Sequence, residues 1–336
     1  MFHKALFRLL IVLAAFSSTA NANVAEIFLE PYGSDAADGS TQNRAVATLQ
    51  RAIDLAAQFD RTQVEKVVIH VGSGIYRGQY VKLDSYHTRI DISIKGAERN
   101  GIPVFDGENK PITWFTLNGQ TQNGGRLHIE GLQIRSYLTA IAFVGNREEP
   151  NRSLGGNIIR HMIFSRIGQS DPKSSLVSTA AIVFVNARNN IVERNKFLDI
   201  RNVKTCVKLH SVYLAHHSSN NKIIGNEFNG FCGSPIRLRD GSNNNFAIGN
   251  LFLNVGSEAL FDEWYCNRSI TVGCTKKTPE CPSWGNQFFF NIVDEPYFKA
   301  ASPYVKVHVP INPEGCENGS NQLLRMETHG NRPLSR

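Results

Sequence analysis

Asparagine recurs through the second half of this chain at a fixed distance from a second asparagine and from a large apolar residue. The repeated unit is Asn, four residues, Asn, one residue, and then the apolar side chain. A degenerate first copy and four full copies follow it: Asn157/Met162/Phe164, Asn190/Asn195/Phe197, Asn221/Asn226/Phe228, Asn245/Asn250/Phe252 and Asn286/Asn291/Val293. The steps between the apolar positions are 33, 31, 24 and 41 residues. Such a length is typical of one supersecondary unit that buries its apolar residues by stacking on its neighbours.

This repeat predicts an all-β fold, a right-handed parallel β-helix. Asparagine suits turn positions because it tolerates left-handed backbone angles and bonds its own backbone. Stacked coils would therefore align the asparagine side chains in ladders. A series of unrelated Asn-rich loops would leave the constant offset of the apolar residue unexplained.

Length and charge are compatible with one large solenoid domain. The chain has 336 residues, of which 41% are hydrophobic, and this is ample for a large core. It carries 36 Lys and Arg against 29 Asp and Glu, a formal charge of +7. A basic surface suits an anionic partner, for which we expect an acidic polysaccharide rather than nucleic acid; solubility alone is the alternative. We expect a monomer.

The N-terminus has the features of an export signal. Positive residues precede an apolar stretch at residues 9–16, and Ala20 and Ala22 form a small-residue cleavage pattern. The apolar stretch is too short to span a bilayer, and no later segment approaches that length. We expect residues 1–22 to be a signal peptide and the mature protein to be secreted or periplasmic.

Six cysteines lie in the second half of the chain: Cys206, Cys232, Cys266, Cys274, Cys281 and Cys316. An even number in an exported protein favours disulfides, with fifteen possible connectivities. Cys206 and Cys232 are about one coil apart and could join adjacent coils. The next three lie in an insertion near residues 262–284, which a covalent link would help to order.

The remaining segments divide the chain into an entry region, the coils and an exit region. Residues 23–60 are expected to hold a strand at 26–32 and an amphipathic helix at 45–59, which would cap the first coil. The β-helix is expected over 61–297. Its early strands are predicted at 66–71, 89–95, 113–117, 126–134 and 140–144. Residues 298–336 lose the repeat and are predicted to be a C-terminal cap and tail.

The entry region carries a family resemblance. Residues 33–55, with a D-x-x-D-G-S loop followed by Ala-Thr-Leu-Gln-Arg-Ala-Ile, and residues 68–76 resemble the entry cap and first coil of pectin-lyase-like right-handed parallel β-helix proteins. The resemblance covers about residues 26–295. It implies the fold and, by itself, says little about a reaction.

The densest group of reactive side chains lies on two successive coils. Placing Asn221 on Asn245 stacks the segment from Lys208 to Asn221 on the segment that begins at Pro235. Strand alternation then directs one set of residues outward. That set pairs Tyr213 with Arg237, Ala215 with Arg239, His216 with Asp240 and His217 with Gly241, and the next coil would bring Asp262 near Arg239.

Such a group suits β-elimination in a uronic-acid chain. A cation must neutralise the sugar carboxylate, a base must remove the adjacent proton, and an acid must protonate the leaving oxygen. Arginine suits the first role because its planar fork pairs with carboxylates. We expect Arg237 and Arg239 to hold the uronate, His217 to be the base and Tyr213 the acid. The expected substrate-binding residues are Lys208, His210, His216, Asp240, Asp262 and Trp264.

A narrower resemblance supports this interpretation. Residues 217–228, followed by Leu238-Arg239-Asp240-Gly241, resemble the chondroitinase-B/alginate-lyase family, in which a K-S-x-x-N segment supplies a lysine base and an L-R-H-G segment a catalytic arginine. Arg239 matches the arginine. His217 stands in place of the lysine and Asp240 in place of the histidine, which puts the identity of the base in doubt.

Three alternatives stay open at this point. The cluster could bind carbohydrate without catalysis, or it could be a set of structural ion pairs. Carboxylates such as Asp240, Asp262 and Glu263 could instead act across coils in a glycoside hydrolase. The sequence shows no metal-ligand pattern; calcium is conceivable as a cofactor, although no cluster of oxygen ligands is evident.

Overall fold

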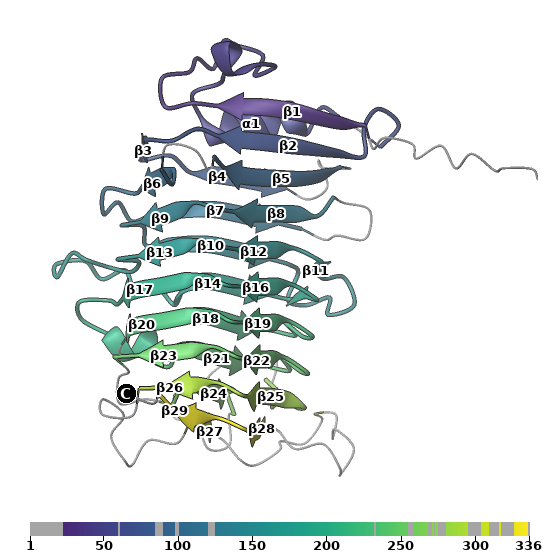
Figure 1. Ribbon diagram of the computed structural model, residues 1–336. Coiled ribbons are helices and arrows are strands. Elements are labelled where there is room, and N and C mark those ends of the chain that lie inside the picture. Colours follow the sequence, from purple (N-terminus) through teal and green to yellow (C-terminus); the bar gives the residue numbers. More distant parts are fainter. Residues whose placement is uncertain are drawn as a thin grey trace, which may run out of the picture.

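Three parallel sheets run along the stack of coils, and successive coils add strands to them (Figure 1). The computed structural model describes residues 23–336 except 60, 85–89, 98–100, 120–124, 232, 255–258, 268–270, 272, 275–279, 295–303, 309–315, 317–325 and 335–336. The expected signal peptide therefore lies outside the described residues. No helix in the described ranges is long and apolar enough to cross a membrane.

Each sheet is built from strands that are one coil apart in the sequence, and every pairing between them is parallel among the described residues. Sheet A contains β1 (Val24–Leu29), β2 (Lys66–Val71), β5 (Asp91–Gly96), β8 (Leu127–Glu130), β12 (Ile158–Arg160), β16 (Ile191–Glu193), β19 (Lys222–Ile224), β22 (Phe246–Ile248), β25 (Asn286–Phe289) and β28 (Met326–His329). Sheet B contains β3 (Ile75–Arg77), β6 (Val104–Asp106), β9 (Gln133–Arg135), β13 (Ile163–Ser165), β17 (Lys196–Ile200), β20 (Glu227–Phe231), β23 (Leu251–Leu253), β26 (Ile292–Val293) and β29 (Arg332–Pro333). Sheet C contains β4 (Val81–Asp84), β7 (Thr113–Asn118), β10 (Thr139–Val144), β14 (Ala180–Val185), β18 (His210–Ala215), β21 (Ile236–Arg239), β24 (Phe261–Trp264) and β27 (Val305–Val307). A short side pair joins β11 (Leu154–Gly155) to β15 (Ala187–Arg188). This is the right-handed parallel β-helix that the asparagine repeat predicted.

The asparagines form two ladders at the turns on either side of each sheet A strand. In the first ladder, the side-chain amide of Asn190 donates to Asn221 Oδ1 at 2.9 Å, and Asn221 donates to Asn245 Oδ1 at 3.0 Å. Each oxygen also accepts the backbone N–H of the asparagine one coil earlier. The second ladder runs through Asn195, Asn226, Asn250, Asn291 and Asn331. These side chains thus replace the backbone partners that the turns leave unmatched.

The apolar member of each repeat forms the core. Phe164, Phe197, Phe228 and Phe252 lie parallel to one another, with ring centroids 4.9–5.0 Å apart. All four are fully buried. Offset aromatic pairs add to the free energy of burying the rings, so the same sequence unit supplies both the turn hydrogen bonds and the core contact.

The predicted N-terminal helix is present but shorter than expected. Helix α1 spans Leu49–Ala56 and follows a short 3-10 helix, η1 (Gln42–Arg44). Thr48 begins it by accepting the Arg51 backbone N–H, and its buried face packs on β1, β2 and β4. That α1 seals the end of the core stays a prediction.

Two boundaries differ from the sequence prediction. The segment 126–134 is two strands, β8 and β9, because Gly131, with φ +72°, turns the chain from sheet A to sheet B. The predicted exit region at 298–336 contains one further coil, since β27, β28 and β29 pair with β24, β25 and β26. Its repeat unit is degenerate, Met326/Asn331/Pro333, and this hid it from the sequence pattern.

Candidate functional site

The outward residues of β18 and β21 have the register that the asparagines predicted. Tyr213 pairs with Arg237, and Ala215 pairs with Arg239. On the next strand, β24, the prediction was wrong: Asp262 pairs with Arg237, and Trp264 pairs with Arg239. Counting from the repeat misplaced Asp262 because the cysteine-containing insertion separates β24 from Asn286, whereas β18 and β21 end shortly before Asn221 and Asn245.

Arg237 is held by a buried carboxylate. Its Nε and Nη2 atoms each donate to Asp262 at 2.6 Å, and Asp262 also accepts from Ser234 Oγ at 2.7 Å and lies 3.0 Å from His308 Nε2. Burial alone would raise the pKa of Asp262, but the His308 and Arg237 hydrogen bonds and the Arg237 charge hold it far below its usual range. The pair is therefore a fixed ion pair, with Asp262 buried beneath the surface rather than exposed to a substrate.

Arg239 lies at the centre of a second group. Its Nε and Nη2 atoms donate to Glu280 at 2.8 and 2.7 Å, and its Nη1 donates to the Tyr213 hydroxyl at 3.2 Å. The guanidinium also lies 4.6 Å from the centroid of the Trp264 ring, a cation–π contact. Burial would lower the pKa of Arg239, but the Glu280 hydrogen bonds raise it above its ordinary value. Arg239 therefore stays charged and rigidly oriented.

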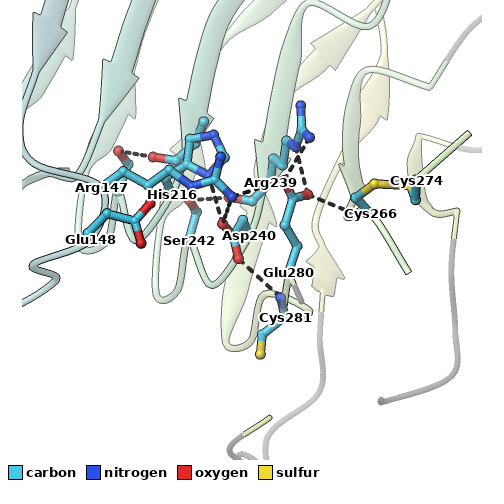
Figure 2. Close-up of polar contacts among 12 residues, drawn as sticks. Arg147, Glu148, His216, Arg239, Asp240, Ser242, Cys266, Cys274, Glu280 and Cys281 are labelled. Atoms are coloured by element: carbon cyan, nitrogen blue, oxygen red, sulfur yellow. Dashed lines mark hydrogen bonds and ion pairs between the residues drawn. A yellow bond between two sulfur atoms is a disulfide. The ribbon is translucent and has the colours of Figure 1, made fainter. Parts of the chain in front are cut away.

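His216 and Asp240 form a hydrogen-bonded pair where β18 and β21 end (Figure 2). His216 Nδ1 lies 2.7 Å from Asp240 Oδ2. Because a carboxylate only accepts, Nδ1 carries the proton and Nε2 is left as the basic nitrogen. His216, His217, Asp240 and Gly241 all have φ between +52° and +67°. Other turns of the solenoid have the same left-handed backbone, for example at Asn189 and Asn220, so here it ends the two strands and does not mark the site.

His217 follows directly and is half-buried. Burial lowers its pKa, so the ring is neutral at neutral pH and can accept a proton. A Cβ atom at Gly241 would come within 2.9 Å of His217 Nδ1, and thus Gly241 makes room for the ring. Arg188 Nε donates to the His217 carbonyl at 3.0 Å.

One predicted substrate-binding residue is buried, and another lies apart from this group. His210 is only 4% exposed, and its Nδ1 is 2.6 Å from the Ser234 carbonyl; its ring stacks on that of Tyr213, with ring centroids 5.7 Å apart. Lys208 is exposed on the 3-10 helix η3 (Cys206–Lys208), before the start of β18. At about 3.3 Å per residue, β18 separates Lys208 from His216 by roughly 20 Å.

Three residues of the cluster were not found from the sequence: Arg147, Glu280 and His308. Arg147 lies between β10 and β11, and its Nη2 is 3.4 Å from both Asp240 Oδ2 and Glu280 Oε1. Glu280 is completely buried and lies in the cysteine-containing insertion. None of the three belongs to a repeat unit, and the only signal near Glu280 was the adjacent Cys281.

A group of side chains here has the composition of a metal site. One ligand atom from each of His216, Asp240 and Glu280 lies within 4.8 Å of the others. Arg147 Nη2 contacts two of the three residues, and Arg239 occupies both oxygens of Glu280. A cation could enter only by displacing Arg147, so in the present arrangement guanidinium groups supply the positive charge.

Disulfides hold the insertion beside the cluster. Cys266 is bonded to Cys274, and Cys281 to Cys316. Cys281 N also donates to Asp240 Oδ1 at 3.1 Å, so the second bond anchors one wall of the site. Cys206 is disulfide-bonded too, while its expected partner Cys232 lies outside the described residues. Disulfides persist in oxidising compartments, which agrees with the expected extracellular or periplasmic location.

Comparison with known proteins gives structural neighbours only. No protein-family model and no curated protein matches the sequence. The chain is similar to the crystal structure of an alginate lyase from Paenibacillus sp. str. FPU-7, with a TM-score of 0.52 and 13% identity over 83% of this chain and 92% of that one. Two weaker likenesses are the complex structure of XylC with xylose, with a TM-score of 0.47 and 12% identity over 84% of this chain and 68% of that one, and the PL6 family alginate lyase AlyGC, with a TM-score of 0.41 and 13% identity over 93% and 39%. At such low identity the first likeness supports the fold alone, a right-handed parallel β-helix.

Proposed function

We propose that this protein cleaves an acidic, uronic-acid polysaccharide by β-elimination. The observation that carries the proposal is the outward cluster at the ends of β18 and β21. There Asp240 holds His216, Glu280 holds Arg239, Arg239 donates to Tyr213, and His217 follows His216. The fold shared with an alginate lyase and the net positive charge agree with such a substrate.

The chemistry assigns a role to each side chain. One of the two adjacent histidines removes the proton on the ring carbon that bears the carboxylate. The released electron pair forms a double bond to the neighbouring ring carbon, and the glycosidic carbon–oxygen bond at that carbon breaks. His217 is neutral because burial lowers its pKa, and His216 presents Nε2 because Asp240 holds Nδ1.

Tyr213 protonates the leaving oxygen. Burial raises the pKa of its hydroxyl, so the group keeps its proton at neutral pH. Its oxygen accepts from Arg239 Nη1, which leaves the hydroxyl hydrogen to donate. A guanidinium beside a phenol also stabilises the negative charge that forms as the proton leaves.

The buried carboxylates argue against glycoside hydrolysis. That reaction needs one protonated carboxylic acid, whereas Asp262 stays ionised in its pair with Arg237. Glu280 and Glu263 are completely buried, with Glu280 bound to Arg239 and Glu263 accepting the Ser283 backbone N–H.

Ultraviolet absorbance tests the proposal. The purified protein is mixed separately with alginate, pectate and chondroitin sulfate, and a rise in absorbance from an unsaturated uronate is expected with one of them. Tyr213→Phe and either His216→Ala or His217→Ala should lower kcat by about 100-fold or more. A flat trace from folded protein with bound polymer would instead indicate a non-catalytic carbohydrate-binding solenoid; new reducing ends without absorbance would indicate a hydrolase.

A further inference from the structure

The arginines of the cluster differ in how many of their donors are already used. Arg237 makes two contacts of 2.6 Å with Asp262, and Arg239 makes contacts of 2.8 and 2.7 Å with Glu280. These are the lengths of strong charge-assisted bonds. Both guanidiniums are thereby paired with a buried negative charge, and a substrate carboxylate would have to compete with that charge.

Arg147 is paired much more weakly. A single atom, Nη2, approaches Asp240 and Glu280, and both distances are 3.4 Å. Its Nε and Nη1 atoms make no hydrogen bond to any residue in the described part of the chain. The side chain is also more exposed, at 29%, than those of Arg237 and Arg239, at 18% and 20%. Arg147 therefore keeps donors available for an incoming anion.

The position of Arg147 suits such an anion. Figure 2 shows its side chain extending toward Asp240 and Glu280, beside His216. Its charge is one of the influences that lower the pKa of His217, so it lies near both candidate bases. A sugar carboxylate bound here would place the acidic carbon–hydrogen bond next to a histidine.

The segment that carries Arg147 is held by one buried side chain. The amide of Asn186 donates to three carbonyl oxygens of the segment, those of Asn146 at 2.7 Å, Glu149 at 2.9 Å and Arg152 at 3.2 Å. Asn186 is fully buried and has a φ of +42°. Its own backbone N–H bonds the Ala215 and His216 carbonyls at the end of β18. One residue thus ties the Arg147 segment to the histidine turn.

We propose that Arg147 binds the carboxylate of the uronic-acid chain and that Asn186 positions the segment that presents it. This inference rests on the proposed function for the identity of the substrate. Arg239 then orients Tyr213, the proposed acid, and Arg237 stays paired with Asp262. Recognition of the substrate carboxylate is left to Arg147.

Calorimetric binding separates this role from turnover. Alginate and pectate oligosaccharides are titrated alongside their carboxyl-reduced forms, and the unmodified protein should prefer the charged forms. Loss of a charge-assisted contact should weaken binding of the charged oligosaccharide by about 10- to 100-fold in Arg147→Ala. Binding of the reduced form should not change. Arg147→Lys should recover part of the affinity because it keeps the charge without the fork.

Two further variants test the positioning role. Asn186→Gly keeps the left-handed backbone but removes the amide, and it should raise KM with little change in kcat. The double variant with Arg147→Ala should bind no more weakly than Arg147→Ala alone. Arg152→Ala is the matched control, since Arg152 lies on the same segment, is 57% exposed and pairs only with Glu149 among the described residues; its affinity should equal that of the unmodified protein.

The outcomes separate this inference from the proposed reaction. Arg147-dependent binding without an absorbance change would overturn the lyase and keep the carboxylate site. Lyase activity that Arg147→Ala leaves unaltered in KM and kcat would keep the reaction and overturn the site. Equal binding of charged and reduced oligosaccharides, or no binding of either, would also overturn it.

Discussion

The asparagine ladders and the arginine–carboxylate cluster both bury polar groups, but they do so in opposite ways. In the ladders a neutral side chain makes the same hydrogen bonds in coil after coil, as Asn190, Asn221 and Asn245 do. In the cluster each ion pair occurs once, and Glu280 lies 41 residues beyond its partner Arg239. Repeated hydrogen bonds thus run along the stack, whereas the unrepeated pairs fix the orientation of Arg237, Arg239 and His216.

Breaking a ladder at its middle should have the largest effect on stability. Asn221→Ala removes the acceptor for the Asn190 backbone N–H and side-chain amide, and both are buried. Buried donors without partners cost about 1–3 kcal/mol each, so we expect a loss of about 4 kcal/mol in the free energy of unfolding, measured by urea denaturation.

The end of a ladder gives the matched control. Asn331 accepts the Asn291 backbone N–H and side-chain amide, but it is only partly buried, and water can replace it. Asn331→Ala should cost about 1 kcal/mol. An equal loss in the free energy of unfolding for the two variants would contradict this explanation, because burial of the ladder would then make no difference.

Breaking the cluster should have a smaller effect on stability and a larger effect on the site. Glu280→Gln leaves the Arg239 charge without its buried partner, and we expect a loss of about 3 kcal/mol in urea denaturation. The pair Lys196–Glu227, at 3.6 Å, is the control because its lysine is exposed and its glutamate only half-buried; Glu227→Gln should change stability by less than about 0.5 kcal/mol. An unchanged urea midpoint for Glu280→Gln would mean that solvent screens the Arg239 charge when the Glu280 charge is removed.

A pH titration should reveal a loss of stability of about the same size, through His210. Burial lowers its pKa in the folded protein to about 4, below the ordinary value of 6.5. The unfolded chain therefore binds more protons between these values, and stability falls as the pH drops from about 6.5 to 4. The loss is on the order of 3 kcal/mol. His210→Asn, which can still donate to the Ser234 carbonyl, should flatten the curve over this range; a slope equal to that of the unmodified protein would assign it to other groups.

The repeat predicted the fold and half of the site because both depend on local spacing. The register that pairs Tyr213 with Arg237 and His216 with Asp240 came from the offset between Asn221 and Asn245, and the structure confirms it. The same counting placed Asp262 on the wrong arginine, since an insertion between β24 and Asn286 breaks the fixed distance from strand to asparagine. The last coil was missed because Met326 and Pro333 replace two of the three repeat residues.

The sequence alone determined the parallel β-helix, the ladders and the two strands that carry Tyr213 and Arg239. Those features repeat, and a repeat records which residues stack. Only the tertiary structure showed that Arg239 is paired with Glu280, that Arg147 reaches Asp240, and that His210 is buried. Such contacts join segments that are not separated by a constant number of residues. Which of their side chains meet is therefore decided by burial and charge pairing in three dimensions and not by sequence spacing.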